Sequence, residues 1–130
     1  MSPETPSRTS LLFDMAWAFA AFVFWGGWAC FVNMEAGLSA GIISGMAQGT
    51  FSFAMTLLMV KAITIIYNRV HGHRFRYVLP TVATMGCSGT LLAATHLLAG
   101  TPNILSTISP PLVIAFFFCL YTVRQLENSV

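Results

Sequence analysis

Charged side chains are scarce in this chain of 130 residues, and they leave long segments with none. They make up 8% of the residues, against about 25% in soluble domains. No charge lies between Asp14 and Glu35 or between Glu35 and Lys61, and the longest uncharged segment separates Arg76 from Arg124. A soluble surface needs charges, whereas an ionised group at a bilayer centre costs about 3 kcal/mol. The pattern excludes a soluble domain and predicts an integral membrane protein.

Motifs for catalysis and metal binding are also lacking. The sequence has no paired carboxylates, no GxSxG, no HExxH and no phosphate-binding loop. The cysteines lie in apolar segments, without a CxxC pair or a Cys–His metal spacing: Cys30, Cys87 and Cys119. We therefore expect no enzyme activity, no cofactor, no metal site and no nucleic-acid partner.

What the chain does have is four apolar segments of the length that crosses a bilayer, about 20 residues each. They cover roughly residues 11–32, 41–60, 78–98 and 104–123. The second stays apolar as far as Tyr67, which predicts a tilted helix or last turns at the interface. We therefore predict an all-α, single-domain protein over residues 1–130, with four transmembrane helices in two hairpins.

The basic residues predict how these helices are oriented. Lys61, Arg69, Arg74 and Arg76 lie between the second and third segments, whereas the turns near residues 34–38 and 99–103 have no Lys or Arg. Short loops rich in Lys and Arg stay in the cytoplasm. We therefore expect residues 68–76 and both termini to be cytoplasmic.

The two predicted hairpins resemble one another. A single offset places Gly37 on Gly100, Gly26 on Gly89 and Lys61 on Arg124. The match indicates either a repeat about an axis along the membrane normal, as in some transporters, or only the general likeness of membrane hairpins.

Four glycines recur at every fourth residue: Gly37, Gly41, Gly45 and Gly49. This spacing puts them on one helix face, where another helix backbone can approach closely. The partner is either the first or the fourth span of the same chain or a second copy, or else the stripe lines a substrate groove.

Polar residues gather toward the outer ends of the spans, where Pro110 and Pro111 should kink the fourth helix or delay its start. The carbonyls that these prolines free near Ser106 and Thr107 need other partners. Either a polar cavity opens there, or a kinked helix satisfies its own backbone. The residues predicted for the cavity are Gln48, Ser106, Ser109, His96 and Glu35.

Two ionic contacts are also predicted. Glu35 and His96 would lie at the outer mouth, as a cation or proton-relay pair or as simple polar anchors. Asp14, near the start of the first span, would pair with Arg76 or Lys61.

The loop after the second span is a candidate headgroup site, formed by Asn68, Arg69, Arg74 and Arg76. Each base near an anionic membrane surface contributes about 1 kcal/mol to lipid binding. The alternative is a loop that serves only to set topology.

Four short spans, cytoplasmic termini and the pair Asn68-Arg69 followed by an aromatic residue together resemble the GtrA-like family. The resemblance implies a protein of the bacterial inner membrane that moves polyprenyl-phosphate-linked sugars, with Asn68 and Arg69 as the shared residues.

We therefore expect a small transporter or flippase-like protein for an anionic lipid or polyprenyl-linked sugar. Its partners would be membrane lipids and a homo-oligomer or larger membrane complex. The alternative is an accessory subunit of such a complex. A transporter predicts a polar cavity reaching mid-membrane, with the glycine groove facing the fourth span. An accessory subunit predicts a filled bundle with an exposed glycine stripe.

Overall fold

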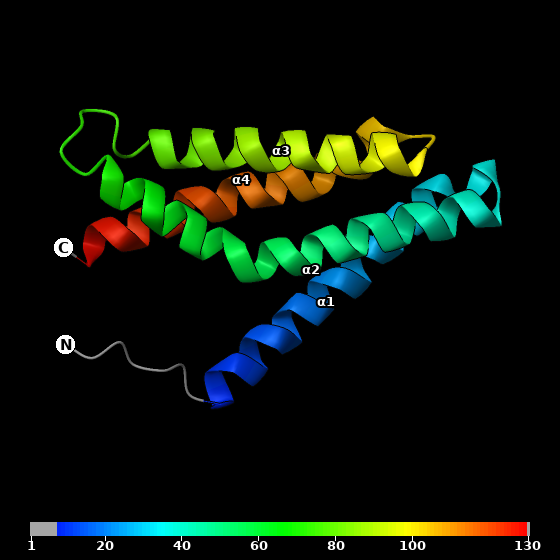
Figure 1. Cartoon of the computed structure of the whole chain (residues 1–130), viewed down its shortest axis with the longest axis horizontal. Helices are drawn as coiled ribbons and strands as arrows, with labels where there is room; N and C mark the ends of the chain where they lie inside the picture. Colours follow the sequence, from blue (N-terminus) through cyan, green and yellow to red (C-terminus); the bar gives the residue numbers. More distant parts are fainter. Residues whose placement is uncertain (1–7, 130) are drawn as a thin grey trace.

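The computed structural model describes residues 8–129 and consists of four long helices joined by short segments (Figure 1). The elements are α1 (Arg8–Asn33), the 3-10 helix η1 (Met34–Ala36), α2 (Leu38–Arg69), α3 (Leu79–Ala99) and α4 (Ile104–Asn128). Each α-helix is long and apolar enough to cross a membrane. The all-α prediction with four spans is confirmed, and the chain is a polytopic membrane protein.

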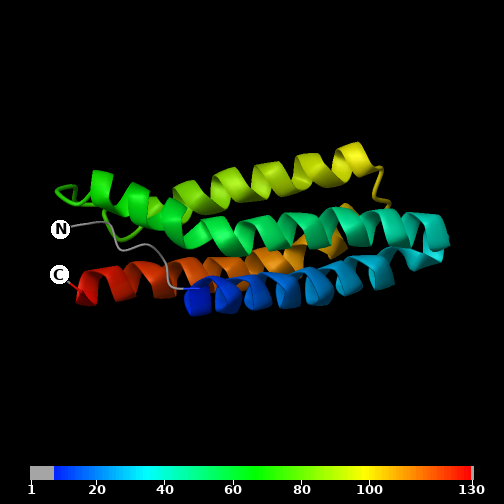
Figure 2. The same ribbon diagram turned by 60° about the horizontal axis from the view of Figure 1, so that its bottom comes forward.

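The helices run along one common long axis (Figure 2). We call one end of the bundle the basic end: it holds the loop of residues 70–78, the start of α1 and the end of α4 (Figure 1). The opposite end, with the turns of residues 34–37 and 100–103, is the turn end. Gly37 and Gly100 have φ angles of 125° and 68°, which side chains rarely adopt, so they allow the chain to reverse there.

The longest helix is α2, with 32 residues. At 1.5 Å per residue it is about 48 Å long, against about 30 Å for the hydrocarbon core of a bilayer. The continuation of this helix to Tyr67, predicted from its apolar sequence, is confirmed. Its last turns must therefore tilt within the membrane or project beyond its core.

The glycine contact lies between α1 and α2. A Cβ atom on Gly26 would lie 2.9 Å from the carbonyl oxygen of Gly45, and one on Gly45 would lie 2.9 Å from the carbonyl oxygen of Gly26. Gly41 and Gly49 would likewise meet Cys30 and Phe22 at 3.0 Å. Three of the four predicted glycines therefore support close backbone packing inside the chain, where lipid supplies no hydrophobic driving force.

Two parts of the glycine prediction are wrong. Gly37 belongs to the turn and not to the stripe, since a Cβ there would meet nothing within 4 Å. The stripe is also filled by α1, so it is neither a groove facing α4 nor an exposed surface. Hydropathy alone does not reveal which helix takes up a stripe of this kind.

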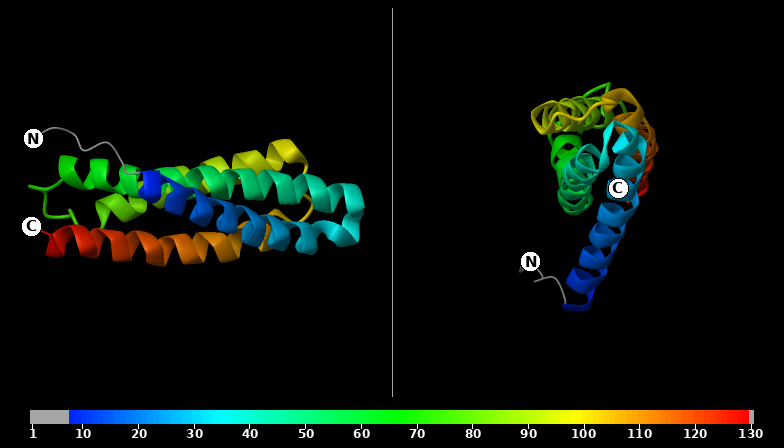
Figure 3. Two further views of the ribbon diagram at one scale, coloured as in Figure 1. Left: turned by 90° about the horizontal axis from the view of Figure 1, so that it is seen from below. Right: turned by 90° about the vertical axis from the view of Figure 1, so that its right-hand side faces the viewer.

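The two hairpins are packed unequally. Contact between α1 and α2 is extensive, whereas α3 and α4 touch far less. From the turn end, α1 diverges from the other helices toward the basic end (Figure 1; Figure 3, right). The internal correspondence in the sequence is therefore not matched by equal packing of its two halves.

Candidate functional site

A cavity of about 610 Å³ lies among the four helices. Its walls are aromatic, aliphatic and small side chains, with Gln48, Ser52, Thr56 and Ser88 as the residues that carry an amide or hydroxyl group. No charged residue lines it within the described part of the chain. Such a lining suits an apolar chain and disfavours an ionic group.

The cavity opens sideways between α1 and α4. Four side chains line the cavity and are also exposed at the outer surface of the bundle: Trp17 and Phe24 of α1, and Ile114 and Phe118 of α4. In a membrane, this surface faces lipid tails. The opening therefore connects the cavity to the hydrocarbon region of the bilayer.

The space arises from the divergence of α1 together with small side chains. Glycine packing holds α1 against α2 over Phe22 to Met34, but α1 makes few contacts with α4. Ala20, Ala21 and Ala115 then leave the gap between the helices unfilled.

Behind one wall of the cavity lies a chain of buried hydrogen bonds. His96 is fully buried, with its Nε2 atom 2.8 Å from Gln48 Oε1 and its Nδ1 atom 2.7 Å from Thr101 Oγ1. Gln48 Nε2 donates to Ser52 Oγ at 3.1 Å, and Ser44 Oγ donates to Thr101 Oγ1 at 3.2 Å. The chain thus joins the turn after α3 to Ser52 on the cavity wall.

A second polar cluster ties α1 to α4 at the turn end. Asn33 Nδ2 donates to Thr107 Oγ1 at 2.8 Å, and Asn33 Oδ1 accepts from the backbone N–H of Asn103 at 2.9 Å. Asn33 is fully buried, so these bonds satisfy an amide that would otherwise be costly to bury. The cluster anchors the turn end of α1, and the divergence of α1 begins beyond it.

The two prolines lie inside α4, which begins at Ile104 and continues through them. Of the two predicted effects, the delayed start does not occur, and α4 begins where the predicted span of residues 104–123 begins. Pro110 has no N–H for the carbonyl of Ser106, and the indole N–H of Trp28 donates to that oxygen instead, at 3.1 Å. The predicted need of this carbonyl for another partner is confirmed, and the partner comes from α1.

Of the five residues predicted for a polar cavity, only Gln48 lines it. His96 lies behind Gln48, whereas Ser106, Ser109 and Glu35 are exposed. The predicted Glu35–His96 pair does not form among the described residues, because the imidazole faces Gln48 and Thr101. Thr56 on α2 and Ser88 on α3 also line the cavity but were not predicted, because they have no distinctive spacing in the sequence.

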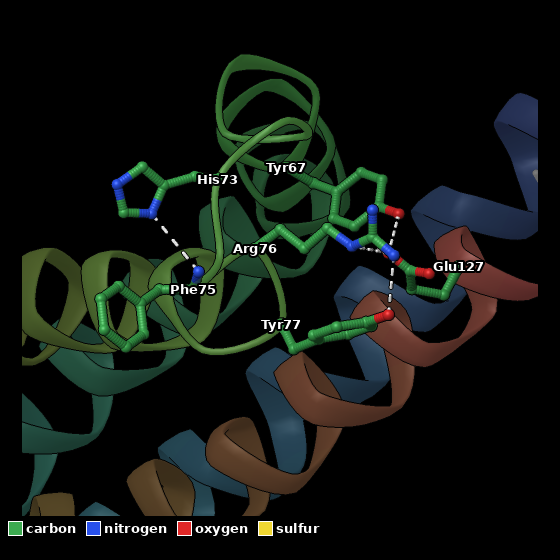
Figure 4. A network of polar contacts seen from close by, with 6 residues as sticks. All are labelled: Tyr67, His73, Phe75, Arg76, Tyr77 and Glu127. Carbon is green, nitrogen blue, oxygen red and sulfur yellow. Dashed lines mark hydrogen bonds and ion pairs between the residues drawn. The ribbon is translucent and has the colours of Figure 1, made fainter.

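At the basic end, Arg76 belongs to a compact polar cluster (Figure 4). Its Nε atom lies 3.0 Å from Glu127 Oε1, and Nη2 donates to Tyr77 Oη at 2.8 Å. The buried Tyr67 donates its hydroxyl hydrogen to the same carboxylate. The hydrogen bond to Tyr77 is the main cause of a raised pKa for Arg76, so the guanidinium stays charged.

This cluster corrects the prediction that Arg76 pairs with Asp14. Its partner is Glu127, at the end of α4. The sequence predicts only that Glu127 and the loop lie at the same end of the bundle, and not that they pair. Asn68, Arg69 and Arg74 are exposed, and Arg74 lies over the Phe75 ring at 5.1 Å. Of the four predicted headgroup residues, Arg76 is thus engaged within the chain, and the other three are exposed at the basic end.

Comparison with protein-family models, with curated proteins and with solved structures finds no match for this chain. Those comparisons support no family assignment, and the chain stands as a four-helix protein with four candidate membrane spans.

Proposed function

We propose that the protein is a small, non-enzymatic transporter or flippase-like protein that takes up the apolar chain of a membrane lipid. The observation that carries the proposal is the cavity of about 610 Å³ that opens between α1 and α4. Its volume falls in the range of about 300–1,000 Å³ that is usual for ligand sites. An apolar chain would enter it directly from the bilayer, without crossing water.

The headgroup of this lipid would stay at the basic end. Arg69 and Arg74 are exposed there, and a phosphate would accept hydrogen bonds from their guanidinium groups. An anionic lipid or a polyprenyl-linked sugar has the required combination of a long apolar chain and a phosphate. With the basic end in the cytoplasm of a bacterial inner membrane, the headgroup would bind from inside.

The alternative, an accessory subunit, depended on a filled bundle with an exposed glycine stripe. The side-opening cavity and the covering of the stripe by α1 both favour lipid handling instead. Because the stripe is used within the chain, a homo-oligomer or larger complex has to assemble through other faces.

The cavity is tested with two matched variants on α1. Ala20 lines the cavity, whereas Ala16 is exposed one turn away and does not. We expect Ala20→Phe to fill the space and to reduce the phospholipid retained by the purified protein, measured by native mass spectrometry. Ala16→Phe should retain as much as the parent. Equal retention by the two variants would exclude the cavity as the lipid site.

The headgroup site is tested separately. Arg69→Gln and Arg74→Gln should each weaken binding of phosphatidylglycerol about fivefold, the equivalent of about 1 kcal/mol per base, and leave phosphatidylcholine unaffected. Lys variants at both positions keep the charge and control for insertion. Unchanged binding in the correctly inserted Gln variants would leave the loop with a role in topology only.

A further inference from the structure

The hydrogen-bond chain behind the cavity has a direction that defines the state of His96. Gln48 donates through Nε2 to Ser52, so its carbonyl oxygen is the atom that faces the imidazole. His96 must then carry its hydrogen on Nε2 and accept at Nδ1 from the Thr101 hydroxyl. Ser44 in turn donates to Thr101, so each of these groups is satisfied with a neutral imidazole.

The same heavy atoms also suit a charged imidazole. A proton added at Nδ1 would be donated to Thr101 Oγ1, the Thr101 hydroxyl would turn to donate to Ser44, and the Ser44 hydroxyl hydrogen would turn away from Thr101. One proton is taken up from water, and no other covalent bond changes. The two oxygens that face the ring, from Gln48 and Thr101, would then both accept charge-assisted hydrogen bonds.

Within residues 8–129, no other ionisable side chain is hydrogen-bonded in this arrangement. From α2 the ring meets Gln48, with Ser44 beyond Thr101, and Thr101 reaches it from the turn after α3. Glu35 is exposed on η1, and the thiol of Cys30 lies against Gly41 in the contact between α1 and α2. Among the described residues, His96 is therefore the ionisable group in the hydrogen-bond chain behind the cavity.

We propose that His96 is a proton-binding site coupled to the lipid cavity, so that proton uptake expels the lipid chain. The coupling follows from the geometry. His96 is hydrogen-bonded to Gln48, and Gln48 is hydrogen-bonded to Ser52. Gln48 and Ser52 both line the cavity. Water in an unoccupied cavity would help to solvate an imidazolium next to it. An apolar chain excludes that water and makes the charged state more costly.

The inference rests on the proposed function for its ligand, but its first test needs no ligand. In the full chain, purified in detergent and labelled at histidine, the His96 signal should titrate as the pH is lowered. The fluorescence of Trp17 and Trp25, which line the cavity, should follow the same midpoint. His96→Gln should abolish both changes, and His73→Gln, in the exposed loop, should abolish neither. A His96 signal that does not titrate at any pH at which the protein stays folded would overturn the proposal.

A second variant covers the case in which His96→Gln does not fold. Thr101→Val keeps the imidazole and the shape of the side chain but removes the oxygen at Nδ1. Because the charged ring loses the stronger hydrogen bond, the titration midpoint of His96 should move to lower pH. An unchanged midpoint would contradict the assigned role of Thr101 and the proposal with it.

The coupling itself is tested with brominated phosphatidylglycerol, which quenches tryptophan fluorescence on contact. The quenching that is lost in Ala20→Phe reports on the cavity. The apparent affinity of the brominated lipid for the cavity is taken from this part of the quenching. In the parent it should be roughly fivefold or more weaker at low pH, and in His96→Gln it should be independent of pH. The same pH profile in both proteins would overturn the coupling. If His96 titrates together with the tryptophan signal but Ala20→Phe removes none of the quenching at any pH, the proton site stands and the proposed function fails.

Discussion

At the scale of single residues, backbone contact between α1 and α2 sets the position of the diverging helix. The decisive atoms are those of Gly26 and Gly45, where an added methyl group on either would meet the other's carbonyl oxygen at 2.9 Å. That distance is shorter than ordinary van der Waals contact, and backbone atoms cannot turn aside as a flexible side chain can.

We predict that Gly26→Ala lowers the free energy of unfolding by about 1–3 kcal/mol through overpacking. The adjacent Gly27 provides the control, because a Cβ there meets nothing within 4 Å. Gly27→Ala should be neutral or slightly stabilising. Thermal or denaturant unfolding in detergent distinguishes them, and equal stability of the two variants would contradict the close contact.

The second prediction concerns Trp28 and the carbonyl of Ser106. Trp28→Phe removes the indole donor and should cost about 1 kcal/mol. In a Pro110→Ala background, the restored N–H of residue 110 can bond this carbonyl, so the same change should cost clearly less. A double-mutant cycle of unfolding free energies measures the difference. Equal costs in the two backgrounds would show that the proline does not create the need for Trp28.

At the scale of elements, the ends of α2 and α4 and the loop between α2 and α3 are joined through one carboxylate. Glu127 at the end of α4 binds both Arg76 of the loop and Tyr67 of α2. Arg76 is therefore engaged within the chain, which leaves Arg69 and Arg74 as the exposed bases of the proposed headgroup site.

We predict that Glu127→Gln loosens this loop. Amide hydrogen exchange over residues 70–78 should become several-fold faster, because the loop loses its ionic contact with α4. Global stability should change little, since the pair is partly exposed and such pairs contribute weakly. Glu35→Gln, on the exposed η1 at the other end, is the control. Exchange in the loop that is the same in both variants would exclude the role of Glu127.

At the scale of the whole molecule, the basic end is predicted to face the cytoplasm. Gly72 in the loop and Pro102 in the opposite turn are both exposed. A membrane-impermeant thiol reagent should label Pro102→Cys in sealed cells and leave Gly72→Cys unlabelled. The parent chain controls for its own cysteines. Labelling of Gly72→Cys alone would invert the orientation and place the headgroup site outside.

The all-α class, the four spans and their approximate limits could be predicted from the sequence by itself. Hydropathy and charge are local properties, and a bilayer acts on each segment separately. The stripe of Gly41, Gly45 and Gly49 and the freed carbonyl of Ser106 were predictable for the same reason. Both follow from spacing and from proline chemistry within a single helix.

Only the tertiary structure decided what each helix faces. The helices are apolar on nearly all sides, so hydropathy does not distinguish a packed face from a lipid-facing one. The partner of the glycine stripe, the partners of His96 and the pairing of Arg76 with Glu127 all depend on how the helices cross and rotate. The cavity depends on the same angle, because it exists where α1 diverges from α4 and small side chains leave the space open.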